Sequence, residues 1–575
     1  MRIETGEAQT FAEVTLDFDG APIVARTGET IAAALIAAGL RALRKTPNGE
    51  ERGIYCGMGV CRECLVEVDG TANLRACMTK VSGPHRVRRQ TAAAAAVPGK
   101  ASPTPGDIPC DSPDIAVIGG GAGGLAAAAA AAEAGARVIL IDERPQLGGQ
   151  FYKQPAALYG GVGPFEDAQF RDGAALIERT RAAGVQIVEG EVWGAFAPLE
   201  LSLVTAAGPR HVRPGRLIVA TGAYERGLPV PGWTLPGVMT TGAAQTLLRS
   251  YRVLAGRRIL VAGNGPLNLQ VARELARAGA HVVAVAELAP RPSWSRSAAL
   301  WQMLRADPAL LRDGVVYLAG LRRRGVPMLF AHRLGLIEKA GEGLRAQLER
   351  WNGVSFSQGP TFLADVVCMG YGFMPSNEVL RALDARQVFD RARGHLVTVR
   401  DADCCTSVPG LYGVGDCCGL GGAHAAREEG IIAAVAAVAT LGRAVPPRLV
   451  EEARAARTRL KRLRLFQKGL WRLFAPSAPA GTAMGRDVLI CRCEEVTLGE
   501  IEAALADGSP SVGGIKRRTR VGMGRCQGRY CGALVAAMAA ERRGGDIDED
   551  AFFAPRPPIK PVRIGDLVGG MKAEP

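Results

Sequence analysis

The stretch Ile115-Ala-Val-Ile-Gly119-Gly-Gly121-Ala-Gly123-Gly124-Leu125 decides the fold of this chain. Its four apolar residues predict a buried strand, its glycines a tight turn, and the alanine-rich run from Leu125 to Glu133 a helix. A second apolar strand, Val138 to Ile141, follows and ends on the acids Asp142 and Glu143. Strand, turn, helix and acid at these distances are the pattern of a dinucleotide-binding β-α-β unit.

Each part of this turn has a physical reason. Gly119 permits the tight turn, Gly121 lets a pyrophosphate reach bare backbone, and Gly124 lets helix and strand pack closely. Unpaired N–H groups of the first helical turn, near Gly123, face the phosphates. The acid at the end of the second strand is expected to bind ribose hydroxyls.

Composition sets outer limits on the rest of the chain. A length of 575 residues predicts about three or four domains, and 48% hydrophobic with 22% charged residues is typical of soluble globular proteins. The formal charge of +14 is spread along the chain, so it does not predict nucleic-acid binding. Without a visible signal peptide or an apolar run of membrane-spanning length, we expect a cytoplasmic protein with reduced thiols.

The fourteen cysteines are clustered, with two groups of four near the two ends of the chain. Cys56, Cys61, Cys64 and Cys77 follow the spacing C-x4-C-x2-C with a fourth cysteine downstream, which is that of a plant-type 2Fe-2S centre. Zinc is the alternative, but zinc sites usually show two separated C-x2-C pairs. The spacing therefore favours an iron-sulfur cluster.

Elements around this first group predict a small domain over residues 1–87. Val14 to Phe18 and Ile23 to Ala25 read as a hairpin, and Ile31 to Ala38 reads as a helix stopped by glycine. The order of hairpin, helix, cysteine loop and strands resembles the β-grasp ferredoxin domain. Residues 88–112, rich in alanine and proline, read as a linker.

The glycine turn and three later pieces predict an α/β core. Leu147-Gly-Gly149-Gln150 interrupts the chain, Arg216 to Ala220 is a strand that ends in Thr221-Gly222, and an apolar strand ends in Gly415-Asp416. In this order they resemble the FAD domain of the flavoprotein disulfide-reductase superfamily, which has two dinucleotide-binding domains. The resemblance assigns residues 113–250 and 357–445 to this domain. The expected FAD-binding residues are Gly119, Gly121, Gly123, Gly124, Asp142, Glu143, Gly149, Gln150, Thr221, Gly222, Gly415 and Asp416.

A second β-α-β unit lies inside the core, in residues 251–356. Gly263 and Gly265 form its turn, and its second strand ends on Glu287, an acid that favours NAD over NADP. The third glycine position holds Asn268, which would crowd helix against strand or reach toward a phosphate. The unit is therefore expected to hold NAD, to hold an adenine nucleotide structurally, or to hold nothing. With no cysteine between Cys110 and Cys368, a redox pair beside the flavin, and hence thioredoxin-like or glutathione-like reduction, is excluded.

The C-terminal part begins with a basic helical connector over residues 446–485, which is either a docking surface or a solvated helix. Residues 486–545 follow, with a capping box from Thr497 to Glu500 and a helix from Gly532 to Arg542. Their cysteines, in the pairs C-x-C and C-x4-C, resemble a bacterioferritin-associated ferredoxin type of 2Fe-2S domain, with zinc as the competitor. The expected ligands are Cys491, Cys493, Cys526 and Cys531. The proline-rich tail, 546–575, is expected to lie extended on its own core or on a partner.

The whole arrangement resembles the α subunits of heteromeric amine and imino-acid oxidoreductases. This group includes opine oxidases, proline and hydroxyproline dehydrogenases, hydrogen cyanide synthase and sarcosine oxidase. The resemblance implies a partner β subunit with its own FAD that oxidises the carbon–nitrogen bond, possible small subunits, an FMN at the subunit boundary, and an external electron acceptor. This chain would then carry electrons between a flavin and two clusters at its opposite ends, and its residues offer no catalytic set of their own. The alternatives are a self-contained NAD(P)H-dependent reductase and a non-enzymatic redox sensor.

Overall fold

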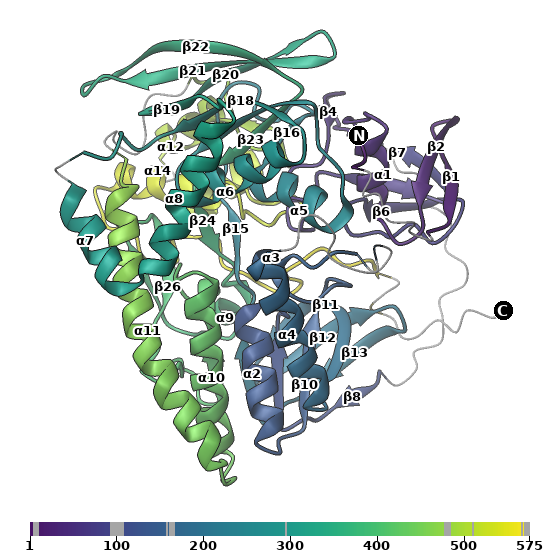
Figure 1. The fold of residues 1–575 in the computed structure, drawn as a ribbon. Coiled ribbons are helices and arrows are strands. Elements are labelled where there is room, and N and C mark those ends of the chain that lie inside the picture. The colour runs from purple at the N-terminus through teal and green to yellow at the C-terminus, as the bar shows by residue number, and fades with distance from the viewer. Residues whose placement is uncertain are drawn as a thin grey trace.

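The computed structural model describes residues 1–3, 11–91, 108–156, 159, 167–293, 296–476, 485–508, 511–564 and 567. Three parts pack against one another: an N-terminal domain, a core with two nucleotide-binding sheets, and a helical C-terminal part (Figure 1). Among the described residues, no helix has both the length and the apolar character that crossing a membrane requires.

The N-terminal domain is a five-stranded sheet in the order β2-β1-β7-β5-β6, packed against helix α1 (Ile31–Ala37). The predicted hairpin and helix are both confirmed. The strands of the domain are β1 (Glu13–Phe18), β2 (Ala21–Arg26), β3 (Arg44–Lys45), β4 (Glu51–Arg52), β5 (Leu65–Val68), β6 (Thr71–Arg75) and β7 (Arg86–Arg89).

The predicted linker is too long at both ends. Strand β7 continues to Arg89 because Arg88 and Arg89 pair with β5. At the other end, β8 (Cys110–Asp111) pairs with the core. Residues 92–107 of the linker lie outside the described residues.

The first core sheet has eight strands in the order β27-β14-β9-β10-β11-β12-β13-β8. Its centre is parallel, and the predicted β-α-β unit is β9, α2 and β10. Helix α2 begins at Ala122, three residues earlier than predicted, directly after the glycine turn. The strands are β9 (Ile115–Ile118), β10 (Val138–Asp142), β11 (Gln186–Phe196), β12 (Glu200–Thr205), β13 (Gly208–Val212), β14 (Arg216–Val219) and β27 (Leu411–Gly413). Around them are α2 (Ala122–Glu133), α3 (Gly149–Tyr152), α4 (Ala168–Ala182), α9 (Glu378–Ala382), α10 (Ala423–Thr440), the short helix η4 (Gly415–Cys417) and the hairpin of β25 (Gln387–Asp390) and β26 (His395–Thr398).

The second core sheet is parallel, in the order β16-β23-β17-β18-β19. Its outer layers are helices and the three-stranded sheet of β20, β21 and β22. The elements are β16 (Val238–Thr240), α5 (Thr241–Tyr251), β17 (Arg258–Gly263), α6 (Pro266–Arg277), β18 (His281–Glu287), α7 (Ser297–Ala306), α8 (Pro308–Arg323), β19 (Met328–Phe330), β20 (His332–Ala340), β21 (Gly343–Trp351), β22 (Phe356–Ala364) and β23 (Val366–Gly370).

The predicted boundaries of this second unit are too narrow. Strands β16 and β23, which the prediction gave to the FAD domain, pair with β17 and with each other. The two units join through β15 (Ala223–Glu225) and β24 (Phe373–Pro375), which pair antiparallel. Buried strands of parallel sheets are all continuous apolar runs, so the sequence of a strand such as β23 does not indicate to which of two parallel sheets it belongs.

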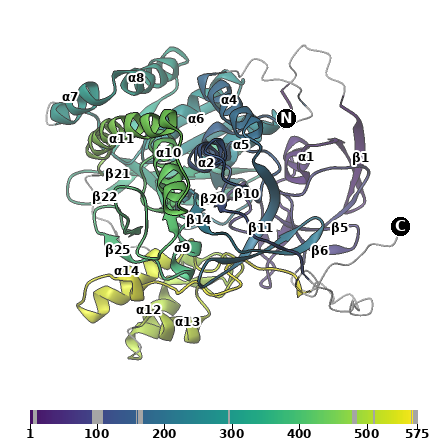
Figure 2. The same cartoon turned by 90° about the horizontal axis from the view of Figure 1, so that it is seen from below.

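The C-terminal part begins with the long helix α11 (Pro447–Leu473), which lies beside α10 and α7 (Figure 1). It continues with β28 (Leu489–Cys491), β29 (Val496–Thr497), α12 (Leu498–Ala506), α13 (Val512–Thr519), α14 (Gly532–Arg543) and the short helix η5 (Glu549–Ala551). Figure 2 shows the last three α-helices gathered on one side, next to α9 and β25. The tail beyond η5 is extended and lies on its own core, where Ile559 donates its N–H to the carbonyl of Trp193 at 2.8 Å.

One hydrophobic core joins the N-terminal domain to the second nucleotide-binding unit. Leu16 and Leu35 of the small domain belong to the same buried cluster as Leu247 and Leu248 of α5. The chain terminus adds a backbone contact, because Arg2 forms a β-bridge with Val253. The N-terminal domain therefore packs against the second nucleotide-binding unit through a buried apolar interface.

Candidate functional site

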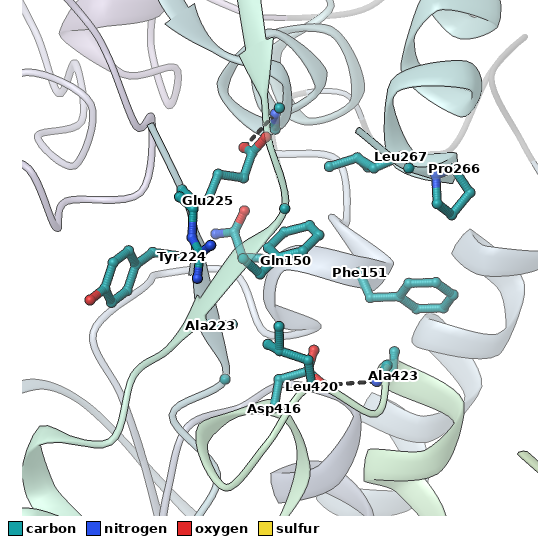
Figure 3. A pocket seen from close by; sticks show the side chains of 18 of the residues that line it. Gln150, Phe151, Ala223, Tyr224, Glu225, Pro266, Leu267, Asp416, Leu420 and Ala423 are labelled. Atoms are coloured by element: carbon teal, nitrogen blue, oxygen red, sulfur yellow. Dashed lines mark hydrogen bonds between the residues drawn. The ribbon is translucent and has the colours of Figure 1, made fainter. Parts of the chain in front are cut away.

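A cavity of about 1920 Å³ lies where the two core sheets meet. Sites for small ligands usually measure roughly 300–1,000 Å³, so this cavity has room for a dinucleotide and more. Figure 3 shows side chains entering it from α3, β15, α6 and the start of α10. Twelve of the fifteen predicted cofactor-binding residues line it: Gly119, Gly121, Gly123, Asp142, Glu143, Gly149, Gln150, Thr221, Gly222, Gly265, Gly415 and Asp416.

The first glycine turn has the geometry that a pyrophosphate needs. A Cβ at Gly124 would lie 1.8 Å from the carbonyl oxygen of Gly119, so helix and strand touch there. A Cβ at Gly121 would meet nothing nearer than 3.9 Å, because that face opens on the cavity. Gly121 caps α2 without a side-chain hydrogen bond, which leaves the positive end of the helix exposed to an anion.

The two predicted ribose acids behave differently. Asp142 accepts the backbone N–H groups of Gly120 and Arg144 and so stabilises the turn itself; burial raises the pKa of Asp142. Glu143 accepts a hydrogen bond from Lys560 of the tail at 2.6 Å. Burial would raise the pKa of Glu143, but Lys560 and Arg75 outweigh it and bring the pKa to about 2.

The residues that follow the carboxyl ends of β14 and β27 also line the cavity. Thr221 donates to the carbonyl of Ser376 at 2.6 Å, which fixes the bend at Gly222. Asp416 accepts the N–H groups of Gly421 and Gly422, both at 2.8 Å, at the start of α10 (Figure 3). Burial raises the pKa of Asp416.

The second glycine turn is built differently from the first. Gly265 lines the cavity, whereas Gly263 and Glu287 lie off its wall. Glu287 is buried and accepts hydrogen bonds from the side chain of Asn264 at 2.8 Å and from the N–H of Gly265 at 3.0 Å. Burial raises its pKa to about 7. The predicted ribose acid is thus tied to its own turn.

Asn268 contradicts its prediction. Its amide donates to the carbonyl of Gly370 at 2.8 Å and its oxygen accepts from Thr241 at 2.8 Å. The side chain neither crowds the helix nor reaches the cavity, because it pairs two buried polar groups of neighbouring elements.

Helix α11 closes the space in front of the second turn. The amide of Asn264 also donates to the carbonyl of Phe474 at 2.9 Å, and Leu470, Leu473 and Phe474 line the cavity there. The basic connector is therefore neither a free docking surface nor a solvated helix along this end. It is a wall of the site.

Sequence reasoning missed two buried ionisable residues, Lys153 and Glu225, that line the cavity. Lys153 donates to the carbonyl of Gly242 at 2.9 Å, and Glu225 accepts the N–H of the same residue at 2.7 Å. Burial lowers the pKa of Lys153 to about 7 and raises that of Glu225 to about 7. The pair can hold or release a proton near neutral pH. The one signal in the sequence was that Lys153 lies three residues after Gln150, a predicted cofactor-binding residue.

The N-terminal cysteines are buried and form two pairs. The thiols of Cys56 and Cys61 contact each other, as do those of Cys64 and Cys77. Cys56 also accepts the N–H groups of Cys61 at 3.4 Å and Met58 at 3.5 Å. Burial alone would raise the pKa of Cys56, but these hydrogen bonds bring it to about 6.

The C-terminal cysteines repeat this arrangement, with Cys491 beside Cys531 and Cys493 beside Cys526. The Cys531 thiol and backbone N–H groups lower the pKa of Cys491 to about 7. In the described part of the chain, no set of three or more His, Cys, Asp or Glu side chains converges as the ligands of a metal ion do. Two thiol pairs per group fit a centre with two irons and four cysteines.

Both cysteine loops reach the same cavity and each other. Met58 and Val60 of the N-terminal loop line the cavity, as do Arg529 and Tyr530 of the C-terminal loop. The expected arrangement, with a cluster at either end of a flavin carrier, is wrong: the fold brings the two cysteine loops together on one side of the predicted flavin site.

Comparison with known proteins decides the family. One of the opine oxidase subunits of Rhizobium meliloti (strain 1021) is 35% identical over 79% of this chain and 98% of that protein. The model of the pyridine nucleotide-disulphide oxidoreductase family matches residues 113–430. The chain belongs to this oxidoreductase family. Its core is accordingly a flavoprotein that binds FAD.

Other family members and domain models extend the assignment. Hydrogen cyanide synthase subunit HcnB of Pseudomonas aeruginosa is 32% identical over 78% of this chain and 96% of that protein. A stretch of 80 residues is 42% identical to subunit HcnA of the same organism, covering 14% of this chain and 77% of that one. A 2Fe-2S cluster binding domain matches residues 12–92, and the sarcosine oxidase A3 domain matches 486–571.

The fold of this oxidoreductase is that of a solved structure, L-proline dehydrogenase from P. horikoshii. The TM-score is 0.70 at 21% identity, and the match covers 99% of this chain and 100% of that one. The matched proteins of R. meliloti and P. aeruginosa are each named as one subunit of an enzyme.

Proposed function

We propose that this chain is the electron-transfer subunit of an amine or imino-acid dehydrogenase, whose carbon–nitrogen bond is oxidised on a partner subunit that carries its own FAD. The observation that carries the proposal is the cavity wall, where both cysteine loops border the predicted flavin site. A subunit built only to hold a flavin has no need of that convergence. The names of the relatives support an opine, proline or sarcosine type of substrate.

The same wall supports the cofactors that we propose. FAD would lie with its pyrophosphate at Gly121 and the N-terminus of α2, its ribose at Glu143 and its ribityl chain near Asp416. When bound, it exchanges electron pairs with the partner and single electrons with the clusters. Each group of four cysteines would hold a 2Fe-2S cluster, and the C-terminal part would be of the bacterioferritin-associated ferredoxin type. An FMN at the boundary with the partner would complete the route.

The chain's own residues prepare the site for this role. Lys153 and Glu225 would hold the proton that accompanies reduction, because both titrate near neutrality beside the cavity. Leu470 and Phe474 line the cavity in front of the second turn and would shield it. An external acceptor would take the electrons from the clusters, in a cytoplasmic complex.

The competing proposal is a self-contained NAD(P)H-dependent reductase that uses the second glycine turn. The carbonyl of Phe474 against Asn264, and the engagement of Glu287 by its own turn, argue against a nicotinamide nucleotide that must enter and leave. An adenine nucleotide held permanently, or none, fits this turn better.

Anaerobic spectroscopy tests the proposal. The purified chain should show flavin and iron-sulfur absorption, keep its colour with NADH, and oxidise neither L-proline nor sarcosine. Addition of the partner subunit together with its amine should bleach the flavin. Rapid bleaching by NADH alone would favour the reductase, and turnover of an amine by the single chain would overturn the division of labour.

A further inference from the structure

Two residues 443 positions apart in the sequence join the cysteine loops, since Arg52 and Glu495 form an ion pair at 2.9 Å. Beside it, the ring of Tyr55 packs edge-on against that of Tyr530, with 5.4 Å between centroids. Tyr55 directly precedes Cys56 and Tyr530 directly precedes Cys531. The contact is therefore made by the immediate neighbours of cysteines from both groups.

Arg492 is the centre of this contact. It lies between Cys491 and Cys493 in the sequence, yet its guanidinium stacks 3.9 Å from the ring centroid of Tyr55 in the other loop. It also donates to the carbonyl of Trp233 at 2.6 Å and is 3% exposed. Cation–π stacking is strongest where water is excluded, as it is around this guanidinium.

Glu63, in the N-terminal cysteine loop, supplies a negative charge opposite Arg492. It lies between Cys61 and Cys64, is 1% exposed, and forms ion pairs with Arg44 at 2.9 Å and Arg492 at 3.7 Å. A buried charge is stable only when paired. If the two loops separated, Arg492 would lose its contacts with Glu63 and Tyr55, and Glu63 would lose one of its cationic partners. The structure therefore favours permanent contact between the two loops.

We propose that Arg492 is a positioning residue that holds two iron-sulfur centres side by side, so that one electron passes directly between them. This rests on the proposed function, which supplies the centres and the reduced flavin as donor. No bond forms or breaks in the step: the centre that gives the electron is oxidised and the centre that receives it is reduced. The positive charge of Arg492 would offset the negative charge of the thiolates of its sequence neighbours Cys491 and Cys493.

Electron paramagnetic resonance of the full chain tests the proximity. The chain is reconstituted anaerobically, its iron and labile sulfide are measured, and it is reduced with dithionite. We expect signals split or broadened by coupling between two reduced centres, with a splitting in gauss that stays the same at two microwave frequencies. Two full centres with independent signals would overturn the inference while the proposed function stands. Zinc or no metal at the C-terminal cysteines would overturn both.

Variants then assign the role of Arg492. Arg492→Leu should weaken the splitting and lower the reduction potential of the C-terminal centre at unchanged iron content. Arg492→Lys should restore part of the potential, because it keeps the charge. Arg518→Leu, on the exposed side of α13, is the control and should change neither.

If Arg492→Leu loses iron, Glu495→Gln replaces it, because it breaks the ion pair with Arg52 and leaves Arg492 in place. This variant should also weaken the splitting. The variant that keeps its iron decides the outcome. If its signal splitting and its reduction potential are both unchanged, the contact between the loops does not position the two centres.

Discussion

Single glycines set the distance between helix and strand at the flavin turn. At Gly124 there is no room for a methyl group, whereas at Gly121 a methyl group would meet no atom nearer than 3.9 Å. The close contact at Gly124 was predicted from the spacing of the glycines and is confirmed, whereas the pyrophosphate site at Gly121 stays a prediction. Which of the two acids would bind a ribose was not predictable, since Asp142 bonds to its own turn and Glu143 to Lys560 of the tail.

Gly124→Ala should destabilise the protein by about 3 kcal/mol, because overpacking against a backbone carbonyl cannot be relieved by a side-chain rotation. It should also lower the flavin content. Gly513→Ala is the matched control, since the nearest atom to its new Cβ is the flexible end of Arg517 at 3.5 Å. Thermal unfolding and the flavin-to-protein absorbance ratio measure both effects. Equal stability of the two variants would contradict the close approach.

Lys560→Met should cost about 1 kcal/mol of unfolding free energy at pH 7. The pKa of Glu143 is lowered to about 2 in the fold, against 4.5 unfolded. The stabilisation is therefore present above pH 4.5 and is lost as pH falls toward 2. Urea unfolding of both proteins at a series of pH values measures it. A difference that grows on acidification would rule out this pairing.

At the scale of elements, local signals predicted ends and caps better than sheet membership. The capping box at Thr497 is present, with Thr497 and Glu500 each bonded to the other's backbone. The hairpin of β1 and β2 is also as predicted. Residues 238–240 and 366–370 were assigned to the FAD domain but form strands of the second sheet, because two parallel sheets use the same apolar runs.

Thr497→Ala should destabilise α12 by about 1 kcal/mol, since its first turn loses a side-chain acceptor. Hydrogen exchange should speed up in residues 498–506 and stay unchanged in α10. Thr458→Ala is the control, because Thr458 lies inside α11, where its hydroxyl bonds only to the preceding turn. If the exchange rates of α12 are the same in both variants, the cap does not limit the opening of this helix.

At the scale of the whole molecule, the N-terminal domain is a fixed part of the core. Arg62 and Arg75 both pair with Glu191 of β11, at 2.9 and 2.7 Å. Arg62 also donates to the carbonyl of Pro561 in the tail. In the relatives from P. aeruginosa the matching regions belong to two subunits, so the linker here joins parts that have their own interface.

Cutting this chain between residues 92 and 107, at an inserted protease site, should therefore leave the two fragments together. Size-exclusion chromatography should show one peak with the mass of the intact chain. Glu191→Ala in the cut protein should shift the balance toward separate peaks, because two arginines lose their partner. If the fragment of residues 1–91 elutes alone after cleavage without that substitution, the domain is a tethered carrier and not a fixed part.

The two β-α-β units, the first glycine turn and the cysteine groups could be predicted from the amino-acid sequence. All of these depend on residues within a few tens of positions, where backbone geometry and periodicity act directly. The folded molecule was needed to show that both cysteine loops meet at Arg492, that Lys560 bonds to Glu143, and that α11 closes the space in front of the second turn. Those contacts join residues hundreds of positions apart, and they are selected by the packing of buried surfaces and charges, which no local pattern records.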